Sequence, residues 1–295
     1  MIYILLLLFI ILAGMTWGLI ESTTLKVDHH NYVMQQDRWF HHSQKRCWSM
    51  HYPNQPETTG LRIALITDIH GYFFNVRHRK ICRTLQRIQP DLVLFGGDLS
   101  TWVADRPYGI RRLEAIAQFC QKNNWLFAGV YGNHDMGLQD DPLKSLLLPL
   151  MENQSLIWTD KKGREWQILG LADLHTRKPD LEKAITNLIY PHTPPLRPVP
   201  AKNRFVLSHN PDVVLQLDIK DAAFLLSGHF HGGQIRLPFR LEYKTLRKDA
   251  LCKLKIYQHQ FEYGGIQGYI SNGIGCVLLP FRFLVPPEIS VLEYL

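Results

Sequence analysis

Residues 61–70 read LRIALITDIH, a short apolar run of β-prone residues that ends in an aspartate and a histidine. The same pattern, an apolar run followed by polar residues, recurs at 91–98 (DLVLFGGD) and 125–134 (WLFAGVYGNH), where glycines separate the apolar run from the polar residues. Between these runs, 77–89 carries apolar residues at helical spacing and 110–122 is amphipathic. Alternation of strand, helix and strand predicts parallel β-structure with crossover helices.

The second half of the chain predicts a different arrangement. A hairpin is expected over 155–171, around the turn residues Lys161, Lys162 and Gly163. We expect further strands at 205–208, 222–227, 254–258, 268–271 and 289–292, helical segments at 181–190 and around 213–217, and a proline-dense surface connection at 191–200. No linker divides the two halves, so the sequence predicts one α/β domain in which a sheet packs on a second, mixed sheet.

Polar side chains of metal-binding types follow five of the expected strands. They are Asp68 and His70, Asp98, Asn133 and His134, His209, and His229 and His231. Each short motif alone has an ordinary structural explanation, such as a turn aspartate or a helix cap. Ligands of α/β sheets gather outside the carboxyl ends of the strands. Five strand ends that each deliver such a residue therefore indicate one functional site.

The residue types indicate the chemistry of this site. Oxygen and imidazole ligands suit manganese, iron or zinc, and no soft thiolate is needed. Two ions roughly 3.5–4 Å apart can clamp a phosphoryl group and lower the pKa of a shared water. An aspartate with two oxygens can bridge such ions, and a nearby histidine can protonate the leaving oxygen. The set predicts a dinuclear phosphoesterase site.

The order of these motifs resembles that of the calcineurin-like metallophosphoesterase superfamily, from about residue 61 to the end of the chain. The motifs that carry the resemblance are Asp68-Ile69-His70, Gly97-Asp98, Gly132-Asn133-His134-Asp135, Ser208-His209 and Gly228-His229-Phe230-His231. Residues 228–238 (GHFHGGQIRLP), 271–275 (SNGIG) and 286–289 (PPEI) look like the membrane-associated phosphodiesterase subgroup, which is similar to UDP-diacylglucosamine pyrophosphatase of lipid A synthesis.

The resemblance implies a four-layer α/β/β/α sandwich and a role for each motif. Asp68, His70 and His231 would hold one divalent metal ion, Asn133, His209 and His229 a second one, and Asp98 would bridge them. His134 would act as proton donor or oxyanion stabiliser and would be oriented by Asp135. We favour manganese, with iron and zinc as alternatives. Arg236 and Asp173 are two further candidates for contacts with the substrate.

The N-terminus predicts a membrane anchor. Residues 2–20 carry no charged side chain. As a helix this stretch would extend about 28 Å, close to the roughly 30 Å of a bilayer core. A signal peptide would have a basic stretch first and a small-residue cleavage site, and the leucine run is unusual for a core helix. We therefore expect a transmembrane helix at 1–20, a linker and lead-in with one edge strand at 21–60, and the metallophosphoesterase domain at 61–295.

The charges beside the apolar stretch predict its orientation. Lys26, Arg38, Lys45 and Arg46 follow it, and no basic side chain precedes it. The positive-inside rule then places a single-pass protein in the inner membrane with its catalytic domain on the cytoplasmic side. The five scattered cysteines agree with a reducing compartment, because they form no CxxC pair or disulfide framework.

The substrate is predicted from the surroundings of the site. A net charge of +7 favours anionic partners. The apolar segments 146–151 and 277–287 are either core or an acyl-chain groove beside the anchor. Together with the anchor, these features predict hydrolysis of a lipid-linked phosphate ester or anhydride, such as UDP-diacylglucosamine, at a membrane.

Other functions of the same fold remain open. A general phosphodiesterase or a nuclease would use the same metal site. We expect no nucleic acid partner, because the chain lacks a basic stripe interleaved with aromatic residues. A non-catalytic scaffold would be expected to lose metal ligands or the catalytic histidine, and every expected position is occupied here.

Overall fold

The computed structural model describes residues 2–35, 38–42, 60–70, 76–138, 149–189 and 198–295. The motif residues named above all lie within these ranges. Part of the proline-dense connection and residues 146–148 of the first apolar segment lie outside them.

The first sheet has seven strands in the order β2-β1-β13-β3-β4-β5-β6. Four of them are parallel to one another: β3 (Leu61–Ile66), β4 (Leu92–Phe95), β5 (Leu126–Val130) and β6 (Leu150–Met151). Strand β13 (Glu288–Tyr294) runs antiparallel to β3, β1 (Lys26–Gln35) runs parallel to β13, and β2 (Arg38–His42) runs antiparallel to β1 at the edge. The carboxyl ends of β3, β4 and β5 therefore meet at one end of the sheet.

The second sheet has six strands in the order β11-β12-β10-β9-β8-β7. The four central strands are parallel: β8 (Glu165–Gly170), β9 (Arg204–Leu207), β10 (Phe224–Ser227) and β12 (Ile266–Ile270). Each edge strand is antiparallel to its neighbour, β7 (Gln154–Thr159) to β8 and β11 (His259–Tyr263) to β12. This mixed sheet agrees with the sequence prediction.

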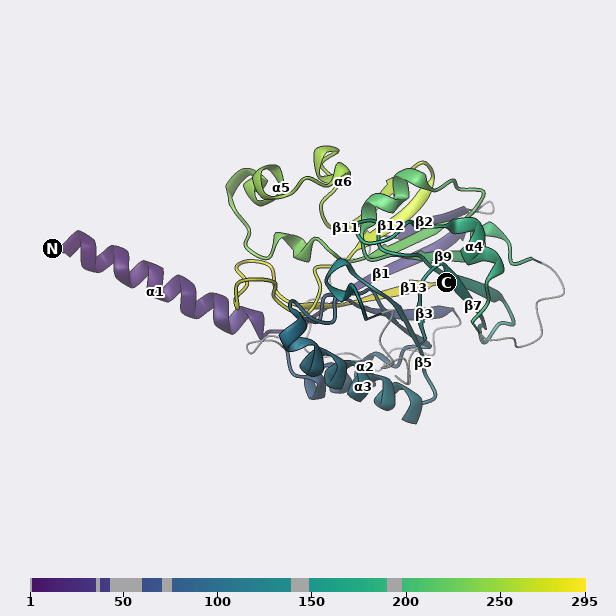
Figure 1. The fold of residues 1–295 in the computed structure, drawn as a ribbon, viewed down its shortest axis with the longest axis horizontal. Coiled ribbons are helices and arrows are strands. Elements are labelled where there is room, and N and C mark those ends of the chain that lie inside the picture. The colour runs from purple at the N-terminus through teal and green to yellow at the C-terminus, as the bar shows by residue number, and fades with distance from the viewer. Residues whose placement is uncertain (1, 36–37, 43–59, 71–75, 139–148, 190–197) are drawn as a thin grey trace.

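The two sheets pack face to face, and helices cover their outer faces, as Figure 1 shows for α2 and α3 beneath the first sheet. Large aromatic side chains fill the space between the sheets, including Trp166, Tyr294 and Phe224. The helices are α2 (His78–Ile88) and α3 (Arg106–Lys122) on the first sheet, and α4 (Leu181–Thr186), α5 (Leu241–Leu246), α6 (Ala250–Lys253) and the 3₁₀ helix η5 (Pro211–Gln216) on the second. Within the described residues, the other short 3₁₀ helices are η1 (Val103–Asp105), η2 (Asn133–Asp135), η4 (Ala201–Asn203), η6 (His231–Gly233) and η7 (Pro238–Arg240). The predicted four-layer α/β/β/α sandwich is confirmed.

The structure departs from the prediction in the lead-in segment. Where the sequence predicted a linker with one edge strand, β1 lies inside the sheet and β2 forms its edge. The reason is that β1 buries polar side chains that hide the alternation of a strand. His30 is buried and its Nε2 lies 3.0 Å from Asp28 Oδ2. Tyr32 stacks on Tyr294 with a ring separation of 4.9 Å, so this segment is part of the core.

Residues 254–258 form no strand, contrary to the prediction. The chain here leaves α6 through a turn, in which the Lys255 N–H donates to the Cys252 carbonyl, and β11 begins only at His259. Ile256 and Tyr257 pack against the core of the second sheet's outer face, which accounts for their apolar character. The predicted helix at 181–190 is shorter than expected, because α4 ends at Thr186 and Leu188 bridges to Ser155.

Helix α1 (Ile2–Ser22) extends away from the two sheets (Figure 1). Its side chains are exposed along almost the whole length, and the mean hydropathy of its most apolar stretch is 2.4. Among the described residues it is the one helix that is long and apolar enough to cross a membrane, by length and composition.

We predict that Trp166→Ala lowers the free energy of unfolding by about 3–5 kcal/mol, because it would leave a cavity between the sheets. Trp166 is fully buried, its ring lies 5.1 Å from that of Phe205, and its Nε1 donates to Asp160 Oδ2. The change is measured by chemical denaturation of the detergent-solubilised full chain. Trp102→Ala removes an exposed tryptophan and should shift stability by less than about 0.5 kcal/mol. Equal denaturation midpoints for the two variants would contradict this account of the core.

Candidate dinuclear metal centre

The ends of five strands, three from the first sheet and two from the second, deliver the predicted ligands to one place. Asp68 and His70 follow β3, Asp98 follows β4, Asn133 and His134 follow β5, His209 follows β9, and His229 and His231 follow β10. Several of these residues take left-handed backbone conformations, with φ of 53° at Asp68, 59° at Asp98 and 70° at His229. Such conformations are costly for residues other than glycine and cluster at functional sites.

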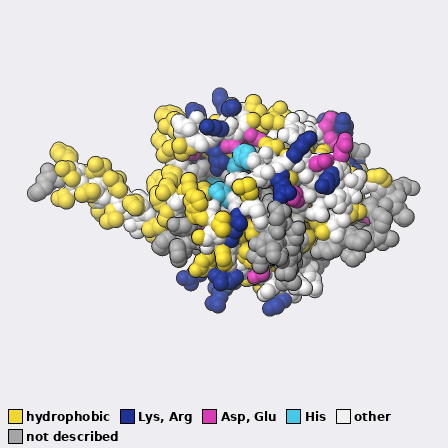
Figure 2. All heavy atoms as spheres, in the orientation of Figure 1, with side chains coloured by type: hydrophobic (Ala, Val, Ile, Leu, Met, Phe, Trp, Pro, Cys, Tyr) yellow, Lys and Arg dark blue, Asp and Glu magenta, His cyan; other side chains and the backbone are white. Residues whose placement is uncertain are grey.

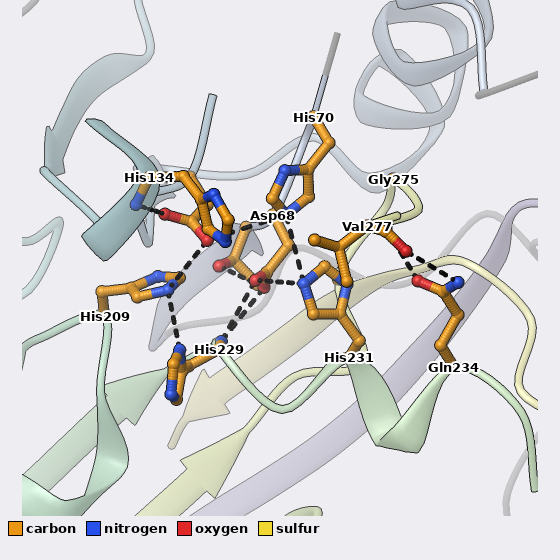
Figure 3. A network of polar contacts seen from close by, with 12 residues as sticks. Asp68, His70, His134, His209, His229, His231, Gln234, Gly275 and Val277 are labelled. Atoms are coloured by element: carbon orange, nitrogen blue, oxygen red, sulfur yellow. Dashed lines mark hydrogen bonds and ion pairs between the residues drawn. The ribbon is translucent and has the colours of Figure 1, made fainter. Parts of the chain in front are cut away.

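The first group of ligand atoms comprises Asp68, His70, Asp98 and His231, which are all buried (Figure 3). His70 Nε2 lies 3.1 Å from His231 Nε2 and 3.6 Å from Asp98 Oδ2. His231 Nε2 lies 3.2 Å from Asp68 Oδ1. Two imidazole nitrogens and two carboxylates therefore face one another within a few ångströms, as the ligands of a metal ion would.

A second group adjoins the first. His209 Nε2 lies 3.2 Å from His229 Nδ1 and also 3.2 Å from Asp98 Oδ2. The side-chain oxygen of Asn133 is buried, and no hydrogen-bond donor reaches it within the described part of the chain. A buried acceptor without a partner is costly unless something else binds it. Asp98 Oδ2 thus faces imidazole nitrogens of both groups, which is the position of a bridging ligand.

The outward nitrogens of three of these histidines, His70, His209 and His229, are held by the protein. His70 Nδ1 lies 3.1 Å from the Ser100 carbonyl, and His209 Nδ1 lies 2.8 Å from the Gly96 carbonyl. His229 Nε2 lies 3.2 Å from Asp249 Oδ1. A carbonyl or carboxylate can only accept, so each of these nitrogens carries the proton and the opposite nitrogen keeps its lone pair for a metal ion.

Burial sets the charge of most of these groups. It lowers the pKa of His70 to about 4 and that of His229 to about 3, which keeps both imidazoles neutral. For His209, burial lowers the pKa, but the Asp98 carboxylate outweighs it and raises the pKa to about 10. Burial raises the pKa of Asp98, whereas His209 lowers it more, so that the pKa lies well below its usual value. In the absence of a cation, Asp98 and His209 thus form an ion pair.

Glycines bring the motifs close together. A Cβ atom on Gly132 would lie 2.1 Å from Asp98 Oδ1, and one on Gly228 would lie 2.0 Å from Thr67 Oγ1. Neither approach is sterically acceptable for a larger residue. The glycines in the Gly-Asn-His and Gly-His-x-His motifs are therefore required by packing around the two aspartates.

Asp135 has a different task from the predicted one. The sequence analysis expected it to orient His134, but its carboxylate accepts hydrogen bonds from the backbone N–H groups of Asp98, Leu99 and Gly132. The His134 ring is held instead through Nδ1, which lies 3.0 Å from the Thr101 carbonyl. Burial, together with Asp98, raises the pKa of Asp135 to about 7. Asp135 fixes the loop after β4 and thereby places Asp98.

The two tentative substrate residues lie in different surroundings. Asp173 is buried, and its negative charge contributes to the raised pKa of His209, which places it near the second ligand group. Its Oδ1 accepts from the His175 backbone N–H. Arg236 donates through Nη2 to Gln258 Oε1, and its backbone N–H donates to the Phe283 carbonyl. These contacts join it to Gln258 and to the loop between β12 and β13.

The sequence analysis missed Asp249 and Arg282. Asp249 lies in the charged stretch 247–253, which matches no motif. Its contact with His229 joins residues that are 20 positions apart and cannot be read from the sequence. Arg282 is fully buried and donates to the carbonyls of His231 and Asn272 beneath the first ligand group. An isolated arginine in an apolar segment gave no signal of such a position.

Comparison with known proteins agrees with this geometry. Residues 61–233 match the family model of calcineurin-like phosphoesterases. The metallophosphoesterase YkuE of Bacillus subtilis is 30% identical over 245 residues, which cover 79% of this chain and 78% of YkuE. The phosphodiesterase YaeI of Escherichia coli is 26% identical and covers 70% of each chain. The UDP-2,3-diacylglucosamine pyrophosphatase LpxG of Chlamydia muridarum is 30% identical over 150 residues, or 50% of this chain and 41% of LpxG.

We predict that Asp249→Asn weakens metal binding by about 10–100-fold, because His229 would lose the carboxylate that fixes its ring and protonation state. The affinity is measured by titrating the metal-free full chain with Mn²⁺. Asp218→Asn, which neutralises an exposed carboxylate, is the control and should bind like the parent. Identical affinities for all three proteins would show that Asp249 does not support a metal ligand.

Proposed function

Since this chain belongs to the calcineurin-like phosphoesterase family and is a phosphoester hydrolase, we propose that it is a two-metal phosphodiesterase or pyrophosphatase that acts on a lipid-linked substrate at a membrane surface. The observation that carries the two-metal part is the position of Asp98 Oδ2, which lies 3.6 Å from His70 Nε2 and 3.2 Å from His209 Nε2. One carboxylate oxygen thus serves two separate groups of ligands.

Each group supplies a complete set of donors for one ion. Asp68, His70 and His231 would hold the first ion, Asn133, His209 and His229 the second, and Asp98 both. The unpaired oxygen of Asn133 supports this assignment, because a cation would satisfy it. The donor set of oxygen and imidazole nitrogen fits manganese, which we favour, and also iron or zinc. When bound, the two ions would supply Lewis-acid activation of the phosphoryl group and of water.

His134 is the residue we assign to proton transfer. The Thr101 carbonyl can only accept, so Nδ1 of His134 carries a proton and Nε2 is the atom free to exchange one with the leaving oxygen. The His134 ring lies 5.4 Å from that of His70, beside the first ligand group. Its backbone N–H also donates to Asp98 Oδ1, which links the position of the acid to that of the bridging carboxylate.

The membrane part of the proposal rests on α1. A helix of 21 residues with almost every side chain apolar and exposed is suited to a bilayer and poorly suited to water. We propose that α1 is a single-pass anchor in the inner membrane. Lys26 and Arg38, which follow it, favour a cytoplasmic position for the two sheets.

The lipid part rests on the anchor, the net charge of +7 and the partial similarity to LpxG. We propose a nucleotide-linked acylated sugar such as UDP-2,3-diacylglucosamine as substrate, cleaved at its pyrophosphate. The wider similarity to the phosphodiesterase YaeI favours a second candidate function, the hydrolysis of simpler phosphodiesters at the same site.

We predict that the detergent-solubilised full chain releases UMP from UDP-2,3-diacylglucosamine in the presence of Mn²⁺. His134→Ala should retain its metal content and lose about 10²–10⁴-fold in kcat, because only the proton donor is removed. Release of UMP and bound metal are measured on the same preparations.

Two results would contradict parts of the proposal, one the substrate and the other the proton donor. Turnover of bis(p-nitrophenyl) phosphate without release of UMP would favour the simpler phosphodiesterase over the lipid enzyme. Equal rates for His134→Ala and the parent would show that His134 does not transfer the proton.

A further inference from the structure

The topology of the first sheet places the start of β1 at the end of the sheet that carries the predicted metal ligands. Strand β13 runs antiparallel to β3, with Ser290 opposite Leu65, and β1 runs parallel to β13, with Lys26 opposite Glu288. Lys26 therefore lies at the end of the sheet where β3 finishes and Asp68 begins. Helix α1 ends at Ser22, shortly before β1, and so leaves the molecule from this end (Figure 1).

The base of α1 is fixed to the loop between β12 and β13. The Arg282 backbone N–H donates to the Gly18 carbonyl at 3.2 Å, and the Leu284 backbone N–H donates to Glu21 Oε2 at 2.6 Å. A Cβ atom on Gly18 would lie 2.9 Å from the Arg282 carbonyl oxygen, so the helix and the loop are in close contact. The side chain of the same residue, Arg282, donates to the carbonyl of His231. Arg282 therefore contacts both the base of α1 and the loop that carries His231.

Six exposed apolar side chains lie at the end of the sheets from which α1 departs, and we call them the apolar rim. They lie in the connections that follow β4, β10 and β12: Val103 in η1, Phe239 in η7, Leu246 at the end of α5, and Leu278, Leu279 and Leu284 in the loop before β13. The most exposed are Phe239 at 84% and Leu246 at 77%. Figure 2 shows apolar surface at the base of the helix with histidine side chains beside it. Contiguous apolar surface of this kind is unusual on a face that meets only water.

The backbone of the rim adds a second observation. Leu278, Leu284 and Phe239 have φ of 61°, 59° and 56°. Glycine, asparagine or aspartate takes this conformation at lower cost than a bulky apolar residue does. The chain therefore keeps large apolar side chains at exposed positions where smaller or polar residues would fit the backbone better.

We propose that the apolar rim docks into the interfacial layer of the membrane that α1 enters, so that the metal centre faces the lipid headgroups. This inference rests on the proposed role of α1 as an anchor. A bilayer is favoured over a protein partner, because the loop that carries Leu278, Leu279 and Leu284 contacts the base of a helix that is apolar on all sides. Basic side chains lie at the same end: Lys80 Nζ donates to the Thr23 carbonyl beneath the helix, and Lys244 and Lys248 are exposed near Leu246.

The docked position explains how a lipid-linked phosphate would reach the site. Helix α1 alone keeps the protein on the membrane, so the rim contributes orientation rather than attachment. With the rim in the interface, the headgroup phosphate of a substrate reaches the metal centre while its acyl chains remain in the bilayer. Loss of the rim should therefore raise the KM for a substrate in vesicles and leave the hydrolysis of a soluble diester unchanged.

The position of the rim is tested by fluorescence, without any turnover. The described cysteines are buried, so a bimane label can be placed at Leu279→Cys in a Cys47→Ser background of the full chain. The protein is reconstituted in vesicles of phosphatidylethanolamine and phosphatidylglycerol that contain phosphatidylcholine brominated near the carbonyl end of its acyl chains. The control is the same label at Ile219→Cys, an exposed apolar position before β10, at the opposite end of the second sheet.

We expect the label at 279 to be quenched by the brominated lipid and the label at 219 to be unaffected. Equal quenching at both positions, or none at 279, would overturn the proposal. Quenching at 279 in a protein that hydrolyses no lipid pyrophosphate would support docking and count against the proposed substrate alone.

Kinetics of paired variants provide a second test. Leu278→Asp/Leu279→Asp is expected to raise the KM for UDP-2,3-diacylglucosamine in vesicles at least tenfold and to leave kcat/KM for bis(p-nitrophenyl) phosphate unchanged. Aspartate suits the left-handed conformation of residue 278, so this variant should fold. Ile219→Asp, at an exposed position before β10 and at the opposite end of the second sheet, should behave like the parent with both substrates. A parallel loss with both substrates, or with neither, would contradict an orienting role.

Discussion

The shared carboxylate of Asp98 is the constraint on which the rest of the structure depends. It must meet His70 from the first sheet and His209 from the second within 4 Å. This requires two sheets packed face to face, with the carboxyl ends of their parallel strands at the same end of the molecule. The aromatic layer of Trp166, Phe224 and Tyr294 sets that packing. The fold thereby assembles a site that neither sheet contains alone.

Holding these ligands in place is costly, and the surrounding structure offsets the cost. Left-handed backbone at positions such as Asp68 and His231 disfavours the folded state by about 1–3 kcal/mol each. Asp135 counters this strain by binding three backbone N–H groups, two of them in the loop that carries Asp98. Arg282 does the same for the loop of His231 by donating to carbonyls. A bound cation would relieve a further cost, that of the unpaired side-chain oxygen of Asn133.

Sequence alone was sufficient to locate strands and candidate ligands where the signal is local. Apolar runs that end in polar residues located β3, β4, β5, β9 and β10 to within two residues, and the residues after them form the ligand groups. It was insufficient where polar residues are buried by distant partners, as in β1, whose Asp28 contacts His259 and Tyr269 from the second sheet. It also failed for Asp249 and for the partner of His134, since these contacts join segments far apart in the chain. Long-range hydrogen bonds leave no periodic trace in a sequence.

The end of the molecule that carries the predicted ligands is also the end from which α1 departs, so the proposed metal chemistry and the proposed membrane attachment would be parts of one arrangement. This arrangement depends on Asp98 as the carboxylate that would bridge two cations. The most direct measurement is anomalous X-ray scattering at the manganese edge from crystals grown with Mn²⁺. The account predicts two peaks roughly 3.5–4 Å apart on either side of the Asp98 carboxylate. A single peak, or peaks away from Asp98, would contradict it.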